Sequence, residues 1–450
     1  MATALIILAA GMGTRMNSEM PKVLHQIAGA PMLIHAMKSG ASLEPDRTVI
    51  VAGHGAEAVG KAAQGWDARA EVVLQAEQLG TGHGVAQARS ALADFAGDAI
   101  VLYGDTPFIR PETLTAMAAA RQFHDVVVLG FDAADPGRYG RLVTAGDTLE
   151  KIVEFKEAAD EERAISLCNS GVVAADAATL FELVALVKND NAAGEYYLTD
   201  IVEIARARGL SATVVRCDEA ETMGINSRAE LAVAEGAFQS ARRAEVLADG
   251  VTLQAPETVY FAHDTVIGRD AVIEPNVVFG PGVTIESGAT IRAFSHLEGC
   301  HVSRDAVVGP YARLRPGTEL ADGVKIGNFV EVKNAQIAEG AKVNHLSYIG
   351  DATVGAATNI GAGTITCNYD GVFKHRTDIG ARVFVGSNTM LVAPVKLGDD
   401  SMTASGSVIT RDVPAEAMAL SRTPQETRQG LAKRMFEKLN SKKAKAAKGA

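Results

Sequence analysis

The sequence predicts two domains of different architecture: an α/β domain with a mostly parallel sheet, followed by a parallel β-helix. In the first half, short aliphatic runs alternate with longer amphipathic stretches, which is typical of a parallel sheet covered by helices on both faces. After Gly250 an aliphatic residue recurs every six positions, a period that fits neither an α-helix nor an ordinary strand meander. The composition agrees, because tight corners use glycine (44 residues) and a narrow interior excludes aromatics (5%).

Composition and charge exclude several classes of protein. The chain has 450 residues, and its apolar content of 47% excludes a disordered chain. The net charge of −11 argues against a nucleic-acid partner, although a local cationic pocket can still hold an anionic small substrate. The four cysteines form no CxxC pair, which favours a reducing compartment. No apolar run is long enough to cross a bilayer, so we expect a cytoplasmic protein without a membrane partner.

The first domain is expected at residues 1–226. The apolar run at its start lacks a preceding basic region, so we interpret it as a buried strand and not as a signal peptide. In parallel sheets ligands bind beyond the carboxyl ends of the strands, so the loops after the strands are where chemistry is expected. We predict strands at residues 4–8, 48–51, 99–102 and 126–129, and helices at residues 32–40 and 111–121.

The loop after the first predicted strand has the composition of a phosphate site. Gly11 and Gly13 let backbone N–H groups approach a phosphate, and Arg15 and Lys22 add positive charge. The segment is neither a P-loop nor a complete dinucleotide fingerprint. Taken alone, the two glycines fit a plain tight turn equally well.

Two further loops carry polar side chains. Gln75, Gly80 and Thr81 form a loop that can hydrogen-bond the edge of a nucleobase, although Thr81 is also a reasonable cap for the following helix. Asp105 follows the hydrophobic strand that ends near Tyr103, a place suited to a Mg²⁺ ligand beside a triphosphate. A structural turn aspartate is the alternative.

Together these loops, LxxGxGTRM…PKVL, QxxQxGTGH and YGDxP, resemble the sugar-phosphate nucleotidyltransferases. Further matches follow in the same order at residues 137–141, 152–156, 169–171, 194–200 and 224–228. The resemblance implies a Rossmann-like domain that transfers a nucleotidyl group from UTP, with Mg²⁺ held by Asp105 and Asn226. It implies a site for UTP and the nucleotide sugar made of Leu8, Ala9, Ala10, Gly11, Arg15, Lys22, Gln75, Gly80, Thr81, Tyr103, Gly104, Asp105, Gly140, Glu154, Asn169 and Asn226.

A linker helix is predicted at residues 227–249, and the repeat occupies residues 250–437. The six-residue phase predicts a coil with flat faces and one inward aliphatic side chain per face. It resembles the hexapeptide-repeat family, which implies a left-handed β-helix and a homotrimer. The aliphatic positions are Ile267, Ile273, Phe279, Ile285, Ile291, Leu297, Val308, Leu314, Leu320, Ile326, Val332, Ile379, Val385, Leu391, Leu397 and Ile409, with Thr403 in place of an aliphatic residue.

The phase breaks between Ile360 and Ile379, and polar residues gather around this break. His345 is a candidate general base, because a neutral imidazole accepts a proton at physiological pH, although a lone histidine is more often a surface residue. The cations Arg315 and Lys333 are one coil of 18 residues apart, which stacks them on one face and suits a phosphate. His296 and His301 have no third histidine in a matching position, which disfavours zinc.

Taken over residues 3–428, the chain resembles bifunctional enzymes that join an N-acetylglucosamine-1-phosphate uridylyltransferase to a glucosamine-1-phosphate N-acetyltransferase. The resemblance implies that His345 is the catalytic base, and that glucosamine 1-phosphate binds Arg315, Lys333, Tyr348 and Asn359. It implies acetyl-CoA contacts, partly from a neighbouring subunit, at Ala362, Asn368, Tyr369, Ser387, Ser405 and Arg422. At position 405 the family often has alanine, which puts that contact in doubt.

Two alternatives remain open at this point: a nucleotidyltransferase whose repeat domain is only structural, and a non-catalytic binding protein of the same architecture. The Lys- and Ala-rich segment 438–450 is expected to be a flexible basic tail.

Overall fold

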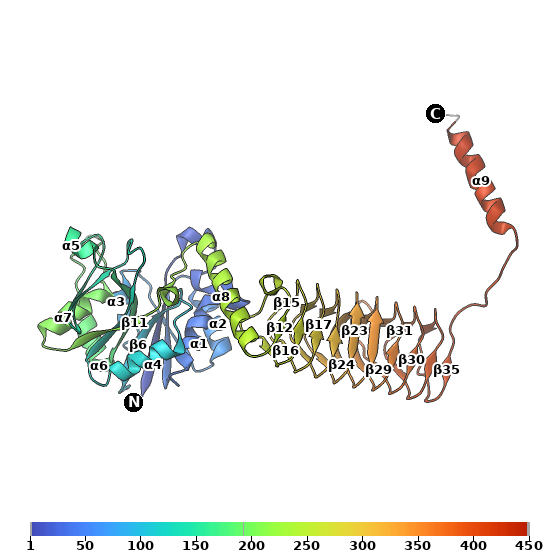
Figure 1. Ribbon diagram of the computed structural model, residues 1–450, viewed down its shortest axis with the longest axis horizontal. Helices are drawn as coiled ribbons and strands as arrows, with labels where there is room; N and C mark the ends of the chain where they lie inside the picture. The colour runs from blue at the N-terminus through green and yellow to red at the C-terminus, as the bar shows by residue number, and fades with distance from the viewer. Residues whose placement is uncertain (1, 192, 448–450) are drawn as a thin grey trace. The chain divides into compact units, whose positions relative to one another are not determined.

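The computed structural model describes residues 2–191 and 193–447, which divide into two compact units. The first comprises Met1–Glu245 and Tyr260–Asp264, and the second Val246–Val259 and Thr265–Ala450. Figure 1 shows an α/β unit followed by a β-helix, as the sequence predicts.

The sheet of the first unit has the strand order β11-β7-β10-β6-β1-β4-β5. Neighbouring strands of this sheet are parallel, except that β10 is antiparallel to both β6 and β7. The hairpin β8–β9 pairs with β10 through β8. The four strands predicted from the sequence are confirmed as β1, β4, β6 and β7. The bounds are β1 Thr3–Ala9, β4 Arg47–Ala52, β5 Glu71–Leu74, β6 Asp98–Tyr103, β7 Val126–Asp132, β8 Arg141–Ala145, β9 Thr148–Val153, β10 Leu167–Asp176 and β11 Ala212–Cys217, with a small hairpin of β2 Gln26–Ile27 and β3 Ala30–Pro31.

Helices cover both faces of this sheet because its central strands are apolar on both sides. One hydrophobic cluster joins the sheet to α3, α6 and α7, and the other joins it to α1, α2 and α4. The two predicted helices are confirmed as α1 and α4. The bounds are α1 Met32–Ala41, α2 Ala56–Trp66, α3 Thr81–Gln87, α4 Pro111–Ala120, α5 Asp160–Arg163, α6 Ala177–Val184 and α7 Ile201–Ala207.

The long helix α8, Arg228–Ala248, packs against the first unit. Its buried Ala234 shares a small core with Ile27, Met32 and Ile225, and the neighbouring Leu231 packs on the same core. The boundary between the two units falls inside this helix, after Glu245.

Parallel strands form three columns in the second unit, one for each side of the coil. The first column is β12 Thr252–Leu253, β14 Val272–Ile273, β17 Thr290–Ile291, β20 Val307–Val308, β23 Lys325–Asn328, β25 Lys342–His345, β27 Asn359–Ile360, β30 Phe384–Val385, β33 Met402–Thr403 and β35 Met418–Ala419. The second is β15 Val278–Phe279, β18 His296–Leu297, β21 Arg313–Leu314, β24 Glu331–Ile337, β26 Tyr348–Val354, β28 Ile365–Cys367, β31 Met390–Val392 and β34 Val408–Ile409.

The third column is β13 Val266–Ile267, β16 Thr284–Ile285, β19 Cys300–Val302 and β22 Thr318–Leu320, continued by the ends of β24 and β26 and then by β29 Thr377–Ile379 and β32 Val395–Leu397. The six-residue prediction is confirmed, because its aliphatic side chains are buried, apart from the half-buried Ile267. Thr403 is also buried at its inward position.

The C-terminal segment differs from the prediction. The sequence predicts a flexible tail from residue 438, whereas a helix, α9, runs from Leu431 to Ala446. Leucine, lysine and alanine are good helix formers, which accounts for helix in a segment without a packed core. The last residues of the expected tail, 448–450, lie outside the described residues.

Candidate active sites

A cavity of about 250 Å³ opens at the carboxyl ends of β1 and β6. Ten residues of the expected nucleotide site line it: Leu8, Ala9, Ala10, Gly11, Lys22, Gln75, Gly80, Thr81, Tyr103 and Asp105. Gly104 is next to this lining and donates its backbone N–H to the Leu8 carbonyl at 3.0 Å. Arg15 does not line the cavity; it is exposed on the short 3₁₀ turn Thr14–Met16.

Two oxygen ligands and one ammonium meet at the rim of this cavity. The Lys22 ammonium donates to the Asp105 carboxylate and, at 3.0 Å, to the side-chain oxygen of Asn226. Asn226 reaches this point because the backbone N–H of Ile225 donates to the Asp105 carbonyl at 3.0 Å. A carboxylate and an amide oxygen directed at one positive charge are the donor set that Mg²⁺ uses beside substrate phosphates. The residues therefore fit the expected metal.

Hydrogen bonds within the polar loop after β5, and to a segment near Leu198, fix the conformation of this loop. Gln75 is buried, and its amide group donates to the Gly80 carbonyl at 3.1 Å. Thr81 is the first residue of α3 and not its cap, and its hydroxyl accepts from the backbone N–H of Leu198 at 3.1 Å. Gly80 has a φ of +110°, and a Cβ there would lie 2.6 Å from the Tyr196 carbonyl oxygen. Only glycine fits this turn.

The three residues expected at the sugar lie together beside this cavity. The backbone N–H of Asn169 donates to the Gly140 carbonyl at 2.9 Å, and a Cβ on Gly140 would lie 3.5 Å from a carboxylate oxygen of Glu154. Burial raises the pKa of Glu154. The hydrogen bond that the Thr199 hydroxyl donates to it at 3.2 Å has the opposite but smaller effect. The Tyr103 ring lies against Gly171, which connects these residues to the cavity wall.

His345 lies at the end of β25, at the corner between the first and second columns of the β-helix. Its Nδ1 is 2.9 Å from the side-chain oxygen of Asn328, one coil earlier. An amide oxygen only accepts, so Nδ1 carries the hydrogen, and in the neutral imidazole Nε2 then has the lone pair. This leaves Nε2 in the state that a general base needs.

Three residues expected to contact acetyl-CoA lie on the coils after His345, at the same corner of the β-helix. Ala362, Ser387 and Ser405 occupy the same corner of successive coils, joined by backbone hydrogen bonds of 3.3 Å (Gly363 N–H to His345), 2.7 Å (Asn388 N–H to Ala362) and 2.8 Å (Gly406 N–H to Ser387). Arg422 donates to the Ser405 carbonyl at 2.7 Å. These residues form one column beside the candidate base.

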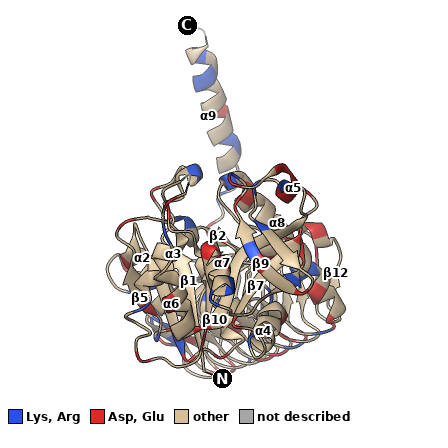
Figure 2. Cartoon of the chain, turned by 90° about the vertical axis from the view of Figure 1, so that its left-hand side faces the viewer, with Lys and Arg blue, Asp and Glu red and all other residues tan. Residues whose placement is uncertain are grey.

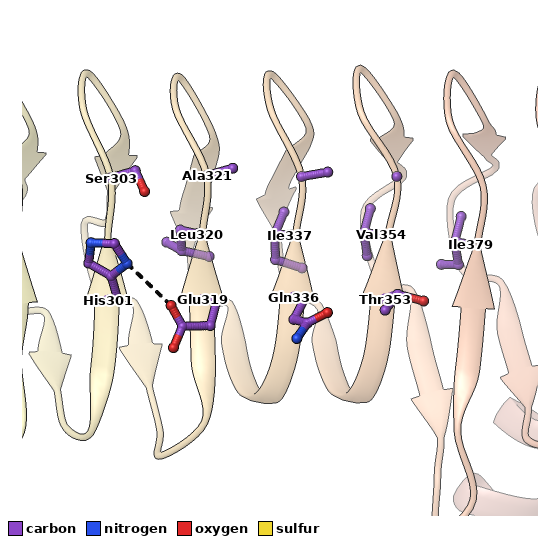
Figure 3. Close-up of a pocket in the computed structure, with 12 residues that line it drawn as sticks. His301, Ser303, Glu319, Leu320, Ala321, Gln336, Ile337, Thr353, Val354 and Ile379 are labelled. Carbon is purple, nitrogen blue, oxygen red and sulfur yellow. Dashed lines mark hydrogen bonds and ion pairs between the residues drawn. The ribbon is translucent and has the colours of Figure 1, made fainter.

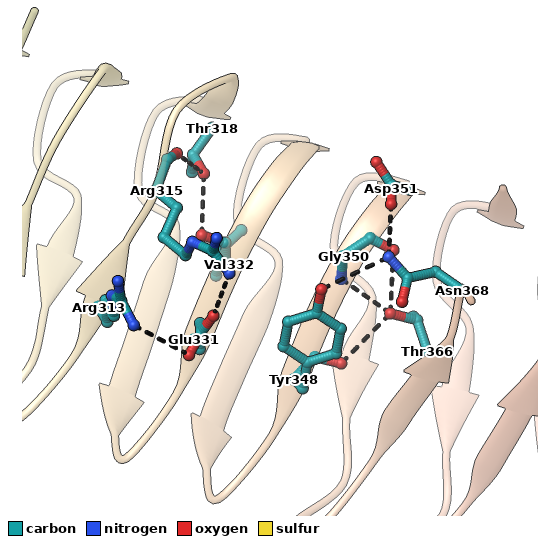
Figure 4. Close-up of polar contacts among 10 residues, drawn as sticks. All are labelled: Arg313, Arg315, Thr318, Glu331, Val332, Tyr348, Gly350, Asp351, Thr366 and Asn368. Atoms are coloured by element: carbon teal, nitrogen blue, oxygen red, sulfur yellow. Dashed lines mark hydrogen bonds and ion pairs between the residues drawn. The ribbon is translucent and has the colours of Figure 1, made fainter. Parts of the chain in front are cut away.

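Three of the expected sugar-phosphate residues lie on the second column: Lys333 in β24, Tyr348 in β26 and Arg315 directly after β21. Figure 4 shows Arg315 and Tyr348. Arg315 donates to Glu331 at 2.8 Å, and the Tyr348 hydroxyl is 3.4 Å from the amide nitrogen of Asn368. Asn359 lies instead on the first column, in register with Lys342. Tyr369 is exposed, and its hydroxyl donates to the Gly371 carbonyl at 2.6 Å.

Lys333 belongs to a charged group beside Tyr348. The neighbouring ammonium of Lys333 lowers the pKa of Lys374, as two close positive charges do. Burial raises the pKa of Asp351, but hydrogen bonds from Asn334 and Asn368 and the two ammonium groups outweigh it, so that this pKa is lowered.

Within one chain, the groove at His345 does not include these residues. It has a volume of about 380 Å³ and is lined instead by side chains of the preceding coils, among them Arg292, Tyr311, Lys325 and Phe329. Arg315, Lys333, Tyr348 and Asn359 are absent from this described lining.

A larger cavity, of about 450 Å³, lies on the third column and contains no expected site residue (Figure 3). Its His301 lies between Glu286 at 2.9 Å and Glu319 at 3.2 Å. His296 is on a different column, and no cluster of three or more His, Cys, Asp or Glu residues able to hold a metal occurs in the described part of the chain.

Comparison with known proteins identifies the family. Residues 5–170 match the model of the MobA-like NTP transferase domain, and residues 264–299 match the bacterial transferase hexapeptide model of six repeats. The chain is 70% identical over 444 residues to the bifunctional protein GlmU of Ruegeria pomeroyi, covering 99% of each chain. The chain belongs to the GlmU family. GlmU proteins of Ruegeria sp. strain TM1040 (67% over 449 residues, all of both chains) and Paracoccus denitrificans (63% over 440 residues, 98% of both) are similarly close.

Among solved structures, the chain is similar to a UDP-glucose pyrophosphorylase complexed with UDP-glucose, with a TM-score of 0.45 and 18% identity over 54% of this chain and all of the other. None of the described helices of this chain is long and apolar enough to cross a membrane.

Several polar residues lie in or beside these sites although the sequence does not predict them there. Gln78 and Glu195 line the nucleotide cavity, and Lys374 lies beside Lys333. Burial, followed by the charges of Glu157 and Glu154, raises the pKa of Asp200 to about 6. Gln78 and Asp200 belong to matched motifs, but nothing in their spacing shows that they reach a cavity or a buried carboxylate.

Proposed function

We propose that this chain makes UDP-N-acetylglucosamine in two steps at two separate sites. Acetyl-CoA first acetylates glucosamine 1-phosphate, and UTP then reacts with the N-acetylglucosamine 1-phosphate formed, releasing pyrophosphate. The observation that carries this function is the presence in one chain of the Lys22–Asp105–Asn226 group and of a histidine whose Nε2 is free to act as a base. Full-length relatives named bifunctional support two activities over a purely structural repeat domain.

In the first reaction, the amine nitrogen of glucosamine 1-phosphate attacks the thioester carbonyl of acetyl-CoA. His345 Nε2 takes a proton from this amine. The new C–N bond forms, the C–S bond breaks, and the coenzyme A thiolate leaves. Asn328 holds the ring in the required tautomer. Acetyl-CoA lies along the corner column from Ala362 to Ser405, with Arg422, Asn368 and Tyr369 beside it.

The sugar phosphate binds Arg315, Lys333, Tyr348 and Asn359. These residues do not line the groove of their own His345, which supports a site completed by a neighbouring chain. The proposed oligomer is a homotrimer. Cations on one side of the coil supply the positive charge that a phosphate monoester requires.

In the second reaction the chain positions the substrates and neutralises charge. The sugar-phosphate oxygen attacks the α-phosphorus of UTP, and pyrophosphate leaves on the opposite side. Lys22 and Arg15 bind phosphate oxygens, Gln75 and Thr81 contact uracil, and the neighbouring Gly140, Glu154 and Asn169 bind the sugar. Asp105 and Asn226 would hold Mg²⁺, which withdraws charge from the phosphates when bound.

The proposed partners are small molecules, without a nucleic acid or a membrane. The proposed compartment is the cytoplasm, which agrees with the four cysteines, all of which are free thiols.

To test this function, the purified chain is incubated with glucosamine 1-phosphate, acetyl-CoA, UTP and Mg²⁺. One component is omitted at a time. Only the complete mixture should give UDP-N-acetylglucosamine. His345→Ala should abolish acetyl transfer and leave uridylyl transfer from added N-acetylglucosamine 1-phosphate, and Asp105→Ala should do the reverse. Normal acetyl transfer by His345→Ala would refute the assignment of the base.

A further inference from the structure

The C-terminal end of the β-helix is open. Strands β34 and β35 are the last strands of the second and first columns, and no described strand pairs with their outer edges. A cavity of about 390 Å³ lies at this end, and its mixed lining includes the apolar Val408, Ile409 and Val413 and the charged Arg411 and Asp412. Met418 and Leu420 also line it and are 54% and 60% exposed. Unpaired strand edges and exposed apolar side chains at the end of a repeat array favour a cap.

An amphipathic helix without a partner follows this open end in the chain. Every residue of α9 is exposed, including four large apolar side chains: Leu431, Met435, Phe436 and Leu439. At 3.6 residues per turn these four lie on one side of the helix. A helix with an apolar side of this size is stable in water mainly when that side is covered.

The charges of the two parts are complementary. Helix α9 carries six Lys and Arg residues against one Glu, and its basic side chains recur along its length (Figure 2). Residues 399–420 carry four carboxylates, those of Asp399, Asp400, Asp412 and Glu416, against Arg411. Arg382 of the preceding coil pairs with Asp400 and lies 4.0 Å from Asp399, so part of this negative charge is already neutralised. A net positive helix is therefore attracted to this end of the β-helix.

The connection between them is long enough. Residues 421–430 contain no helix or strand and separate β35 from α9 (Figure 1). Ten residues span at most about 35 Å, whereas neighbouring coils of the β-helix are only about 5 Å apart. The helix therefore reaches the last coil of its own chain without disturbing any strand.

We infer that α9 folds back as the cap of its own β-helix, with Leu431, Met435, Phe436 and Leu439 covering Val408, Met418 and Leu420. The cap shields the edges of β34 and β35 and fills the open cavity. This inference does not depend on the proposed catalytic function.

Hydrogen exchange of the full-length chain, followed by mass spectrometry, tests the cap. Phe436→Asp places a charge in the apolar side and should speed exchange in α9, β34 and β35 by about tenfold or more. Ser441→Asp makes the same change of charge on the opposite side of the helix and should leave exchange unchanged. Met418→Asp should reproduce the effect of Phe436→Asp from the other partner. Unchanged exchange in the earlier strands β20 and β23 shows that the rest of the β-helix of each variant is folded.

Other occupants give different results. If α9 instead covers a second copy of the chain, mixed oligomers of Met418→Asp and Phe436→Asp chains recover protection, because each supplies the part that the other lacks. If α9 binds lipid, protection appears only with phosphatidylglycerol vesicles. Either result overturns the inference, as does an equal response to Phe436→Asp and Ser441→Asp.

Discussion

The side-chain oxygen of Asn226 lies 3.0 Å from the Lys22 ammonium, which also donates to Asp105. A lysine therefore occupies the point at which a divalent cation and its two oxygen ligands are proposed to meet. A divalent cation held by Asp105 and Asn226 would compete with the ammonium for the same oxygens.

Lys22→Met should therefore separate metal binding from catalysis. Without nucleotide, the variant should bind Mn²⁺ more tightly than the unaltered chain, because no ammonium competes for Asp105 and Asn226. Its uridylyl transfer should fall by about 100-fold or more, because a phosphate contact is lost. Calorimetry or Mn²⁺ resonance spectroscopy measures the affinity, and the exposed Lys61→Met is the control. Equal Mn²⁺ affinity in all three proteins contradicts the competition.

Asn328→Ala should lower the kcat of acetyl transfer by about 10-fold or more, because the His345 ring loses the acceptor that fixes its tautomer. Asn328→Asp should restore the contact but move the pH dependence of acetyl transfer to higher pH, because a carboxylate stabilises the imidazolium. Rates measured from pH 6 to 9 check both results. Uridylyl transfer by the same preparations is the internal control, and an unchanged acetyl-transfer profile in both variants shows that Asn328 does not act on His345.

Asp200→Asn should stabilise the first unit in alkaline but not in acidic solution. Burial raises the pKa of Asp200 from 3.8 to about 6, with smaller contributions from Glu157 and Glu154. A folded-state pKa above the unfolded one means that stability falls as the pH rises from about 4 through 6, since the folded chain resists ionisation. Urea unfolding at pH 8 should therefore show a more stable variant, and the gain should shrink toward pH 4.5. Asp147 is exposed, and Asp147→Asn should show no such gain. If the effect of Asp200→Asn did not change with pH, the raised pKa of Asp200 would not be its cause.

Val385→Ala should destabilise the β-helix by about 2 kcal/mol, because two buried methyl groups are lost from a closely packed interior. Val385 is fully buried, whereas Val266 is 56% exposed on an outer position of the same β-helix. Val266→Ala should change the free energy of unfolding by less than about 0.5 kcal/mol. Chemical unfolding followed by loss of acetyl transfer measures both, and similar effects of the two substitutions would contradict the inward assignment of Val385.

Much of the fold is predictable from the sequence because it depends on local periodicity. The alternation of aliphatic and amphipathic segments predicts β1, β4, β6, β7, α1 and α4. The six-residue phase predicts the inward side chains, down to Thr403 as a substitute for an aliphatic residue. Such patterns reflect which side of a strand or coil faces the interior, and they need no knowledge of distant contacts. The helix α9 was missed because its helical propensity lies in a segment whose composition also suits a flexible tail.

The sequence by itself therefore determined the two architectures and which loops follow the strands of the sheet. Only the tertiary structure decided which side chains meet. The backbone hydrogen bond from Ile225 to Asp105 brings Asn226 to Lys22, across 204 positions of sequence. The structure also decided that Arg315, Lys333, Tyr348 and Asn359 do not line the groove at His345 within one chain. The physical reason is that periodicity specifies the face of each element, whereas the meeting of distant loops depends on strand order and on the hydrogen bonds between loops.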